Sequence, residues 1–124
     1  MSDDTKINET MELRLNYDER GLIPVVVQDA EDSSLLMLAY ANRRALEITK
    51  ETGYATFWSR SKKRLWTKGR TSGDLLEMVD IRVDCDQDSL LYRVKKVGEN
   101  VCHTKRKSCF YRRINTDGGL EFIK

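Results

Sequence analysis

Short runs of β-branched and apolar residues alternate with polar turns along most of the chain, a pattern typical of short β-strands. The clearest run is Ile23–Gln28, where the single proline stands near the start, a position that a strand tolerates. A polar turn at Glu31–Ser34 separates it from a second apolar run, Leu35–Tyr40, so these segments predict a hairpin. Other runs predict strands at Tyr54–Ser59, Leu65–Lys68, Leu76–Val83, Leu90–Val97, Cys109–Ile114 and Leu120–Ile123.

One segment has the spacing of a helix instead. Asn42 is a suitable N-cap, Arg43–Thr52 places apolar residues along one face, and Gly53 is well placed to end the helix. One main helix among short strands predicts an α+β domain with mostly antiparallel pairing. Residues 1–12 are polar and weakly periodic, so we expect a flexible tail there and a single domain over residues 13–124.

The composition narrows the class of protein. The chain has 124 residues, 34% of them charged, and it contains no apolar run long enough to cross a bilayer. Met1–Glu12 lacks the apolar stretch of a secretory signal, so we expect a cytoplasmic protein without membrane contact. A reducing cytoplasm disfavours disulfides, which leaves metal binding, catalysis or burial for the three cysteines.

Charge is distributed unevenly along the chain. The formal net charge of +2 is too small to make nucleic acid the expected partner. Thr52–Gly73 and Asn100–Thr116, however, contain no acidic residue although both are rich in lysine and arginine. Acidic residues gather between them, mainly in Asp84–Asp88. Two basic segments therefore flank one acidic strip.

Cys85, Cys102 and Cys109 are candidate zinc ligands, because thiolates are soft ligands that suit zinc. The sole histidine, His103, directly follows Cys102, and in an extended segment these two side chains would rarely share one metal. Three protein ligands with the fourth position open are typical of a catalytic zinc site. The spacing alone also allows cysteines that are simply buried.

Asp84, Asp86 and Asp88 are candidate ligands for a second metal ion. In an extended segment they share one face, and their hard oxygen ligands suit Mg²⁺ or Ca²⁺. An EF-hand loop does not fit, because its sixth position would be Ser89 rather than Gly and its twelfth Lys95 rather than Glu. A strand edge blunted by charge is the alternative, but repulsion between such close charges favours a bound divalent cation.

Four stretches taken together resemble one enzyme family: Phe57–Ser61, Leu65–Gly73, Val83–Asp88 and Cys102–Phe110. They resemble the phosphoribosyl-AMP cyclohydrolases of histidine biosynthesis, which hydrolyse the C6–N1 bond of the adenine ring of phosphoribosyl-AMP. The resemblance implies an intertwined homodimer with zinc at the subunit interface, bound by cysteines of both chains. It also implies that the three cysteines bind zinc and the three aspartates bind Mg²⁺.

Some positions depart from the family pattern. Arg70 stands where a glutamate is usual in the Lys-Gly-Glu-Thr-Ser-Gly stretch, which puts in doubt any role for a carboxylate there. Lys105 replaces the usual glycine after Cys-His-Thr, and Asn100-Val101 replaces a pair such as Pro-Ala. None of these departures falls on a candidate metal ligand.

His103 is the candidate general acid–base, because its unperturbed pKa of about 6.5 suits proton transfer and it adjoins a zinc ligand. The alternative is a histidine that only hydrogen-bonds a neighbouring group. The two basic segments suit a substrate with two phosphates. The candidate ligands for these phosphates are Arg60, Ser61, Lys68, Thr71 and Ser72. For Lys62, Lys63, Lys105 and Lys107 we expect an ordinary solvated surface.

Three other functions make different demands on this sequence. A zinc deaminase would need a His-x-Glu motif and a Pro-Cys-x-x-Cys motif, and neither can be built from this sequence. A zinc-stabilised RNA-binding module would use Phe57, Trp58 and Trp66 among the basic residues, and it predicts a closed site of four zinc ligands. An interaction domain with buried cysteines predicts no bound metal.

Overall fold

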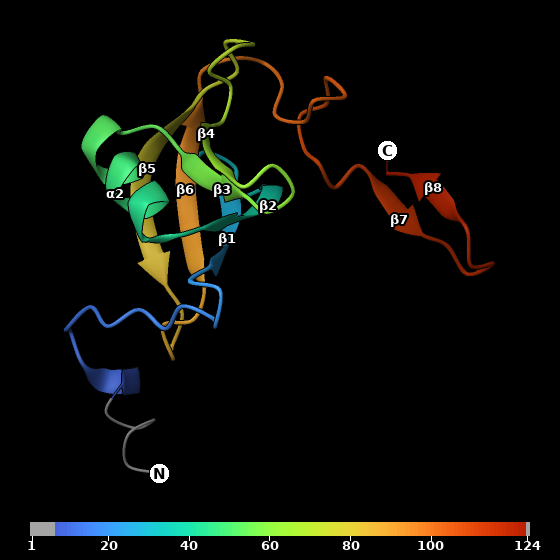
Figure 1. Cartoon of the computed structure of the whole chain (residues 1–124). Helices are drawn as coiled ribbons and strands as arrows, with labels where there is room; N and C mark the ends of the chain where they lie inside the picture. Colours follow the sequence, from blue (N-terminus) through green and yellow to red (C-terminus); the bar gives the residue numbers. More distant parts are fainter. Residues whose placement is uncertain (1–6, 124) are drawn as a thin grey trace.

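A four-stranded sheet forms the centre of the computed structural model, which describes residues 7–123 (Figure 1). The strand order is β2-β1-β6-β5, where β1 is Ile23–Asp29, β2 is Leu35–Ala41, β5 is Leu76–Val83 and β6 is Leu90–Lys96. The hairpins β1–β2 and β5–β6 are antiparallel, and β1 and β6 are parallel. The predicted α+β class and mainly antiparallel pairing are confirmed.

Helix α2 (Arg43–Thr52) has the ends that the sequence predicts. The Asn42 side chain accepts a hydrogen bond of 2.8 Å from the Ala45 amide, which satisfies a donor left free in the first turn. At the other end Gly53 adopts φ of 79° and its N–H donates to the Thr49 carbonyl. Within residues 7–123, no helix is long and apolar enough to span a membrane.

The two-stranded ribbon of β3 (Thr56–Ser59) and β4 (Arg64–Thr67) joins α2 to the sheet. Phe57 is fully buried, and its ring centroid lies 5.1 Å from that of Trp66 and 5.6 Å from that of Tyr92 on β6. These contacts tie the ribbon to the core, which contains the alternate β1 residues Ile23, Val25 and Val27. In the β3–β4 register Phe57 faces Trp66, whereas Trp58 faces Leu65.

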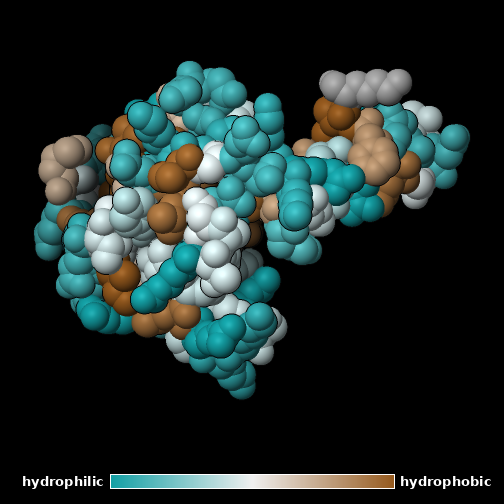
Figure 2. All heavy atoms as spheres, turned by 90° about the horizontal axis from the view of Figure 1, so that it is seen from above, coloured by the Kyte–Doolittle hydropathy of each residue, from teal (hydrophilic) through white to brown (hydrophobic). Residues whose placement is uncertain are grey.

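The C-terminal hairpin of β7 (Arg112–Ile114) and β8 (Leu120–Phe122) extends away from this body (Figures 1 and 2). Its apolar side chains have little cover within the chain: Ile114 is 79% exposed and Phe122 60%. The strand predicted to begin at Cys109 in fact begins at Arg112. Residues 108–109 lie instead against β2, where the Cys109 amide donates to the Leu36 carbonyl at 2.7 Å.

The acidic strip forms a tight turn between β5 and β6, so the extended conformation considered for Asp84–Asp88 is wrong. The Gln87 amide donates to the Asp84 carbonyl, and Gln87 itself takes a φ of 57°. The Gln87 side chain is buried, and it binds the N-terminal segment through two hydrogen bonds. Its amide oxygen accepts a hydrogen bond from the Arg14 amide, and its amide nitrogen donates one to the Glu12 carbonyl. Of the tail expected over residues 1–12, residues 1–6 lie outside the described part.

Candidate active site

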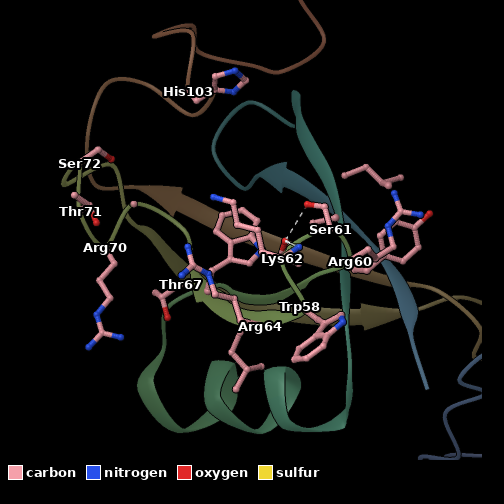
Figure 3. A pocket seen from close by; sticks show the side chains of 17 residues that line it. Trp58, Arg60, Ser61, Lys62, Arg64, Thr67, Arg70, Thr71, Ser72 and His103 are labelled. Carbon is pink, nitrogen blue, oxygen red and sulfur yellow. Dashed lines mark hydrogen bonds between the residues drawn. The ribbon is translucent and has the colours of Figure 1, made fainter. Parts of the chain in front are cut away.

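An open pocket of about 1160 Å³ lies over the outer side of the β3–β4 ribbon and the end of β2 (Figure 3). Its lining includes Tyr40 from β2 and both Trp58 and Trp66 from the ribbon. Two loops complete it: the β3–β4 turn and the loop that follows β4. His103 reaches the rim from the segment that follows β6.

The charge of this lining has one sign. Arg60, Lys62, Arg64 and Arg70 contribute to it, and the lining contains no aspartate or glutamate. Within residues 7–123 none of these four side chains forms an ion pair. Because arginine and lysine are charged at neutral pH, this lining carries positive charge, which suits an anionic ligand.

The β3–β4 turn owes its shape to Ser59. Its carbonyl accepts from the Lys63 amide at 2.9 Å, and its hydroxyl accepts from the Lys62 amide at 3.2 Å. This folding places Arg60 beside β2, where its guanidinium carbon lies 3.9 Å from the centre of the Tyr40 ring. The turn therefore presents cationic side chains along one side of the pocket.

The loop after β4 is shaped by close backbone contacts. Gly69 has φ of 82°, and a Cβ there would collide with the backbone carbonyl of Asp74. The Gly73 amide donates to the Gly69 carbonyl at 2.8 Å, which closes the loop. Thr71 and Ser72 thereby line the pocket with their hydroxyls.

Cys102 and His103 lie in a turn, so the extended conformation considered for this pair is wrong. The Cys102 amide donates to the Arg106 carbonyl, and the Lys105 amide donates to the Cys102 carbonyl. Lys105 has φ of 65°, which explains why a glycine suits this position. The turn brings Cys102 Sγ to 3.9 Å from His103 Nδ1.

Cys102 and Cys109 lie close enough for each thiol to alter the pKa of the other. Burial acts to raise the pKa of Cys102, but hydrogen bonds from Thr104 (3.0 Å) and Cys109, with the charge of Arg106, bring it below its usual value. Burial and the adjacent Cys102 raise the pKa of Cys109 to about 11, although Lys68 opposes the shift. Two adjacent thiols, one of them with a lowered pKa, are ligands of the kind that a soft metal ion prefers.

Cys85 does not join them within one chain. It lies in the turn before β6, whereas Cys102 follows that strand, and the two ends are visible at opposite ends of the sheet in Figure 1. The seven residues of β6 alone span about 20 Å at roughly 3.3 Å per residue. Among the described residues, Cys85, Cys102 and Cys109 form no three-ligand group.

The aspartates do gather, although by a turn rather than a strand. Carboxylate oxygens of Asp84, Asp86 and Asp88 lie within 4.8 Å of one another. Hydrogen bonds with Asp86 and Asp84, together with their negative charges, raise the pKa of Asp88 to about 6. Asp84 also accepts from the Ser89 hydroxyl at 2.6 Å, so it shapes the turn as well. Oxygen ligands this close suit Mg²⁺ or Ca²⁺.

The structure thus divides the candidate residues of the sequence into three places. The pocket lining includes Arg60, Ser61, Thr71, Ser72 and His103. Lys68 is outside that lining, and its charge acts on Cys109 instead. The turn before β6 holds Asp84, Asp86, Asp88 and Cys85.

Sequence reasoning missed several lining residues, namely Tyr40, Lys62, Arg64 and Arg70. Lys62, for which an ordinary solvated surface is expected from the sequence, lines the pocket. Arg64 could have been found from the predicted strands, because it flanks the same β3–β4 turn as Arg60. No local signal linked Tyr40 to that turn, since β2 and β3 are brought together only by the fold.

Comparison with known proteins supports one family. The family model described as phosphoribosyl-AMP cyclohydrolase matches residues 37–111. A phosphoribosyl-AMP cyclohydrolase of Archaeoglobus fulgidus is 54% identical over 105 residues, which cover 85% of this chain and 96% of that protein. One from Sphingopyxis alaskensis is 55% identical over 107 residues, covering 86% and 84%. One from Brucella canis is 48% identical over 119 residues, covering 95% and 86%. With the matched region containing the pocket turns, the cysteines and the aspartates, the chain belongs to the phosphoribosyl-AMP cyclohydrolase family.

Proposed function

We propose that this chain hydrolyses the C6–N1 bond of the adenine ring of phosphoribosyl-AMP, giving the formimino-aminoimidazole carboxamide ribonucleotide. The observation that carries this proposal is the acid-free cationic lining of the pocket, whose arginine and lysine side chains form no ion pair within residues 7–123. Each phosphate monoester carries about −1.5 to −2 charges near pH 7, so two phosphates match the charge of Arg60, Lys62, Arg64 and Arg70. The substrate has two such groups with a purine between them.

The arrangement of the pocket supports this substrate. Figure 3 shows Arg60 and Arg70 on opposite sides, with Lys62 and Arg64 between them. Trp58 is half-buried and lines the pocket, so it offers an aromatic surface to a purine, whereas Trp66 packs on Phe57. His103 lines the rim of the pocket, where it would border a bound substrate.

We infer that zinc is bound by Cys102 and Cys109 of one chain and by Cys85 of a second chain. The paired thiols fit a thiolate-binding metal, and the separation of Cys85 by the length of β6 requires another chain to complete the site. A zinc ion with an open position supplies a water molecule activated for attack at neutral pH. His103 would move protons there, a role supported by the distance of 3.9 Å between its Nδ1 and Cys102 Sγ.

A homodimer is the assembly that this arrangement requires, and the C-terminal hairpin supports it. Ile114, Leu120 and Phe122 are each more than half exposed, a large apolar surface for so short a hairpin. A second copy of the chain is the partner we propose for this surface, in an intertwined dimer. Free cysteines as zinc ligands also fit a reducing compartment, so we infer that the enzyme acts in the cytoplasm.

The three aspartates are the ligands we propose for Mg²⁺. Their carboxylates lie within 4.8 Å of one another, and hydrogen bonds with Asp86 and Asp84, with their charges, raise the pKa of Asp88 to about 6. A divalent cation would relieve the repulsion among these carboxylates. In the dimer this turn would accompany Cys85 towards the zinc ligands of the other chain. Mg²⁺ would then lie near the substrate phosphates, which it commonly contacts in proteins.

Turnover and metal content test the proposal directly. The absorbance change of ring opening should be seen with phosphoribosyl-AMP, should disappear on chelation, and should return with Zn²⁺. Protein purified without chelator should contain about one zinc per chain and sediment as a dimer. Zinc without turnover, together with salt-sensitive RNA binding, would instead favour an RNA-binding module. Absence of both zinc and turnover would contradict the enzyme and favour an interaction domain.

A further inference from the structure

Arg60, an exposed arginine, lies against an aromatic ring. Its guanidinium carbon lies 3.9 Å from the centre of the Tyr40 ring, the shortest such contact among the cation–aromatic pairs of the described residues. Within residues 7–123 it forms no ion pair with a carboxylate. An aromatic ring therefore restrains this side chain, and no opposite charge neutralises it.

The two partners come from separate parts of the chain. Tyr40 is half-buried on the edge strand β2, opposite Pro24 in the register, so its backbone is fixed by the sheet. Arg60 begins the β3–β4 turn, which Ser59 closes by two hydrogen bonds. Both side chains line the pocket. A rigid strand thus sets the position of a cation on a surface turn.

We propose that Tyr40 is a positioning residue that holds Arg60 ready to bind a substrate phosphate. An ion pair would also hold the arginine, but it would compete with the phosphate for its charge. The ring leaves the guanidinium N–H groups free to bind a phosphate oxygen pair in the fork geometry that arginine prefers. The cost of ordering a long side chain is then met before the ligand arrives.

This inference rests on the proposed function, because it assigns Arg60 to one of the two phosphates. The size of the effect follows from the strength of cation–aromatic contacts, which corresponds to about 2- to 30-fold in binding. Tyr40→Leu should therefore raise KM for phosphoribosyl-AMP by that factor and change kcat by less than about twofold. Tyr40→Phe keeps the ring and should behave like the unchanged protein.

A double-mutant cycle separates positioning from other roles. In an Arg60→Ala background, Tyr40→Leu should have little further effect on KM, because the side chain that it positions is gone. Tyr17→Leu is a matched control, since Tyr17 has its own cation–aromatic contact with Arg43 at 5.0 Å, away from this pocket. An equal loss from Tyr40→Leu in both backgrounds, or an equal loss from Tyr40→Phe, would overturn the proposal.

Binding of two unreactive compounds makes the test independent of turnover. AMP and ribose 5-phosphate each represent one phosphate-bearing half of the substrate, and calorimetry gives their affinities. Tyr40→Leu should weaken the binding of at least one of these two compounds by about the factor by which it raises KM. In an Arg60→Ala background, Tyr40→Leu should not weaken that binding further. If Tyr40→Leu weakens binding but the unchanged protein never opens the ring of phosphoribosyl-AMP, the proposed reaction would be refuted and the positioning role of Tyr40 supported. Normal turnover with both affinities and KM unchanged would refute the role of Tyr40 alone.

Discussion

Mixing two inactive variants tests whether each zinc site draws on two chains. Cys85 lies before β6 and the pair Cys102 and Cys109 lies after it, about 20 Å away along the strand. In a dimer with twofold symmetry, each site would take Cys85 from one chain and the pair from the other. Cys85→Ser alone and Cys109→Ser alone should therefore each lose zinc and activity at both sites.

A mixed dimer of the two variants behaves differently. One of its sites combines both defects, but the other combines the intact Cys85 of the Cys109→Ser chain with the intact pair of the Cys85→Ser chain. Random exchange makes about half of all dimers mixed, and half of their sites are intact. The mixture should therefore recover about a quarter of the activity and zinc content of the unchanged protein.

The assay is ring opening by absorbance after the two variants have been unfolded together and refolded with Zn²⁺. Differently tagged chains, isolated by two affinity steps, give pure mixed dimers, which should reach about half of full activity. Cys85→Ser refolded alone is the matched control. Pure mixed dimers without zinc or activity would show that the three cysteines meet within one chain, and the argument from the length of β6 would be wrong.

Three further predictions follow from the site and its supporting loops. His103→Ala should lower kcat by about 10²- to 10⁴-fold with zinc content unchanged if the residue transfers protons; loss of zinc, measured by atomic absorption, would make it a metal ligand instead. Gly69→Ala should lower the free energy of unfolding by more than about 1 kcal/mol, because φ of 82° strains an alanine and its Cβ meets Asp74. Gly119→Ala, whose Cβ has only ordinary contacts at 3.7 Å, is the control in the same urea titration. The metal-free protein should become less stable as pH rises through about 6, because the raised pKa of Asp88 means that folding favours its protonated form. Thermal melting with and without Mg²⁺ checks this prediction. A pH effect on stability that Mg²⁺ leaves unchanged would contradict the metal assignment.

The strands and helix were predictable where local chemistry determines them. Asn42 and Gly53 are signals that act on the helix ends themselves, and both cap the helix as expected. Strand β1 was predictable from its run of β-branched residues, but only the structure shows that Ile23, Val25 and Val27 face the core while the residues between them are half-buried. The parallel pairing of β1 with β6 was not predictable, since it joins segments more than sixty residues apart.

The candidate site was predictable in its chemistry but less so in its geometry. The expected alternation of Asp84–Asp88 assumed a strand, whereas a left-handed Gln87 folds the segment into a turn. The same assumption separated His103 from Cys102, which the turn brings within 3.9 Å. In both places a short polar segment forms hydrogen bonds within a turn. The periodicity of apolar and polar residues in the sequence does not predict such a turn.

The separation of the metal ligands has a consequence for how the protein would become active. If the zinc site needs Cys85 of a second chain, zinc binding stabilises only the dimer, and dimer formation in turn raises the affinity for zinc. Dilution should then release zinc and activity together, because the pair Cys102 and Cys109 alone provides two ligands. The aspartate turn beside Cys85 would arrive with it, so one association step would complete the zinc site and bring Mg²⁺ to the phosphates. The exposed hairpin β7–β8, which extends away from the body in Figure 1, would give this association an apolar surface.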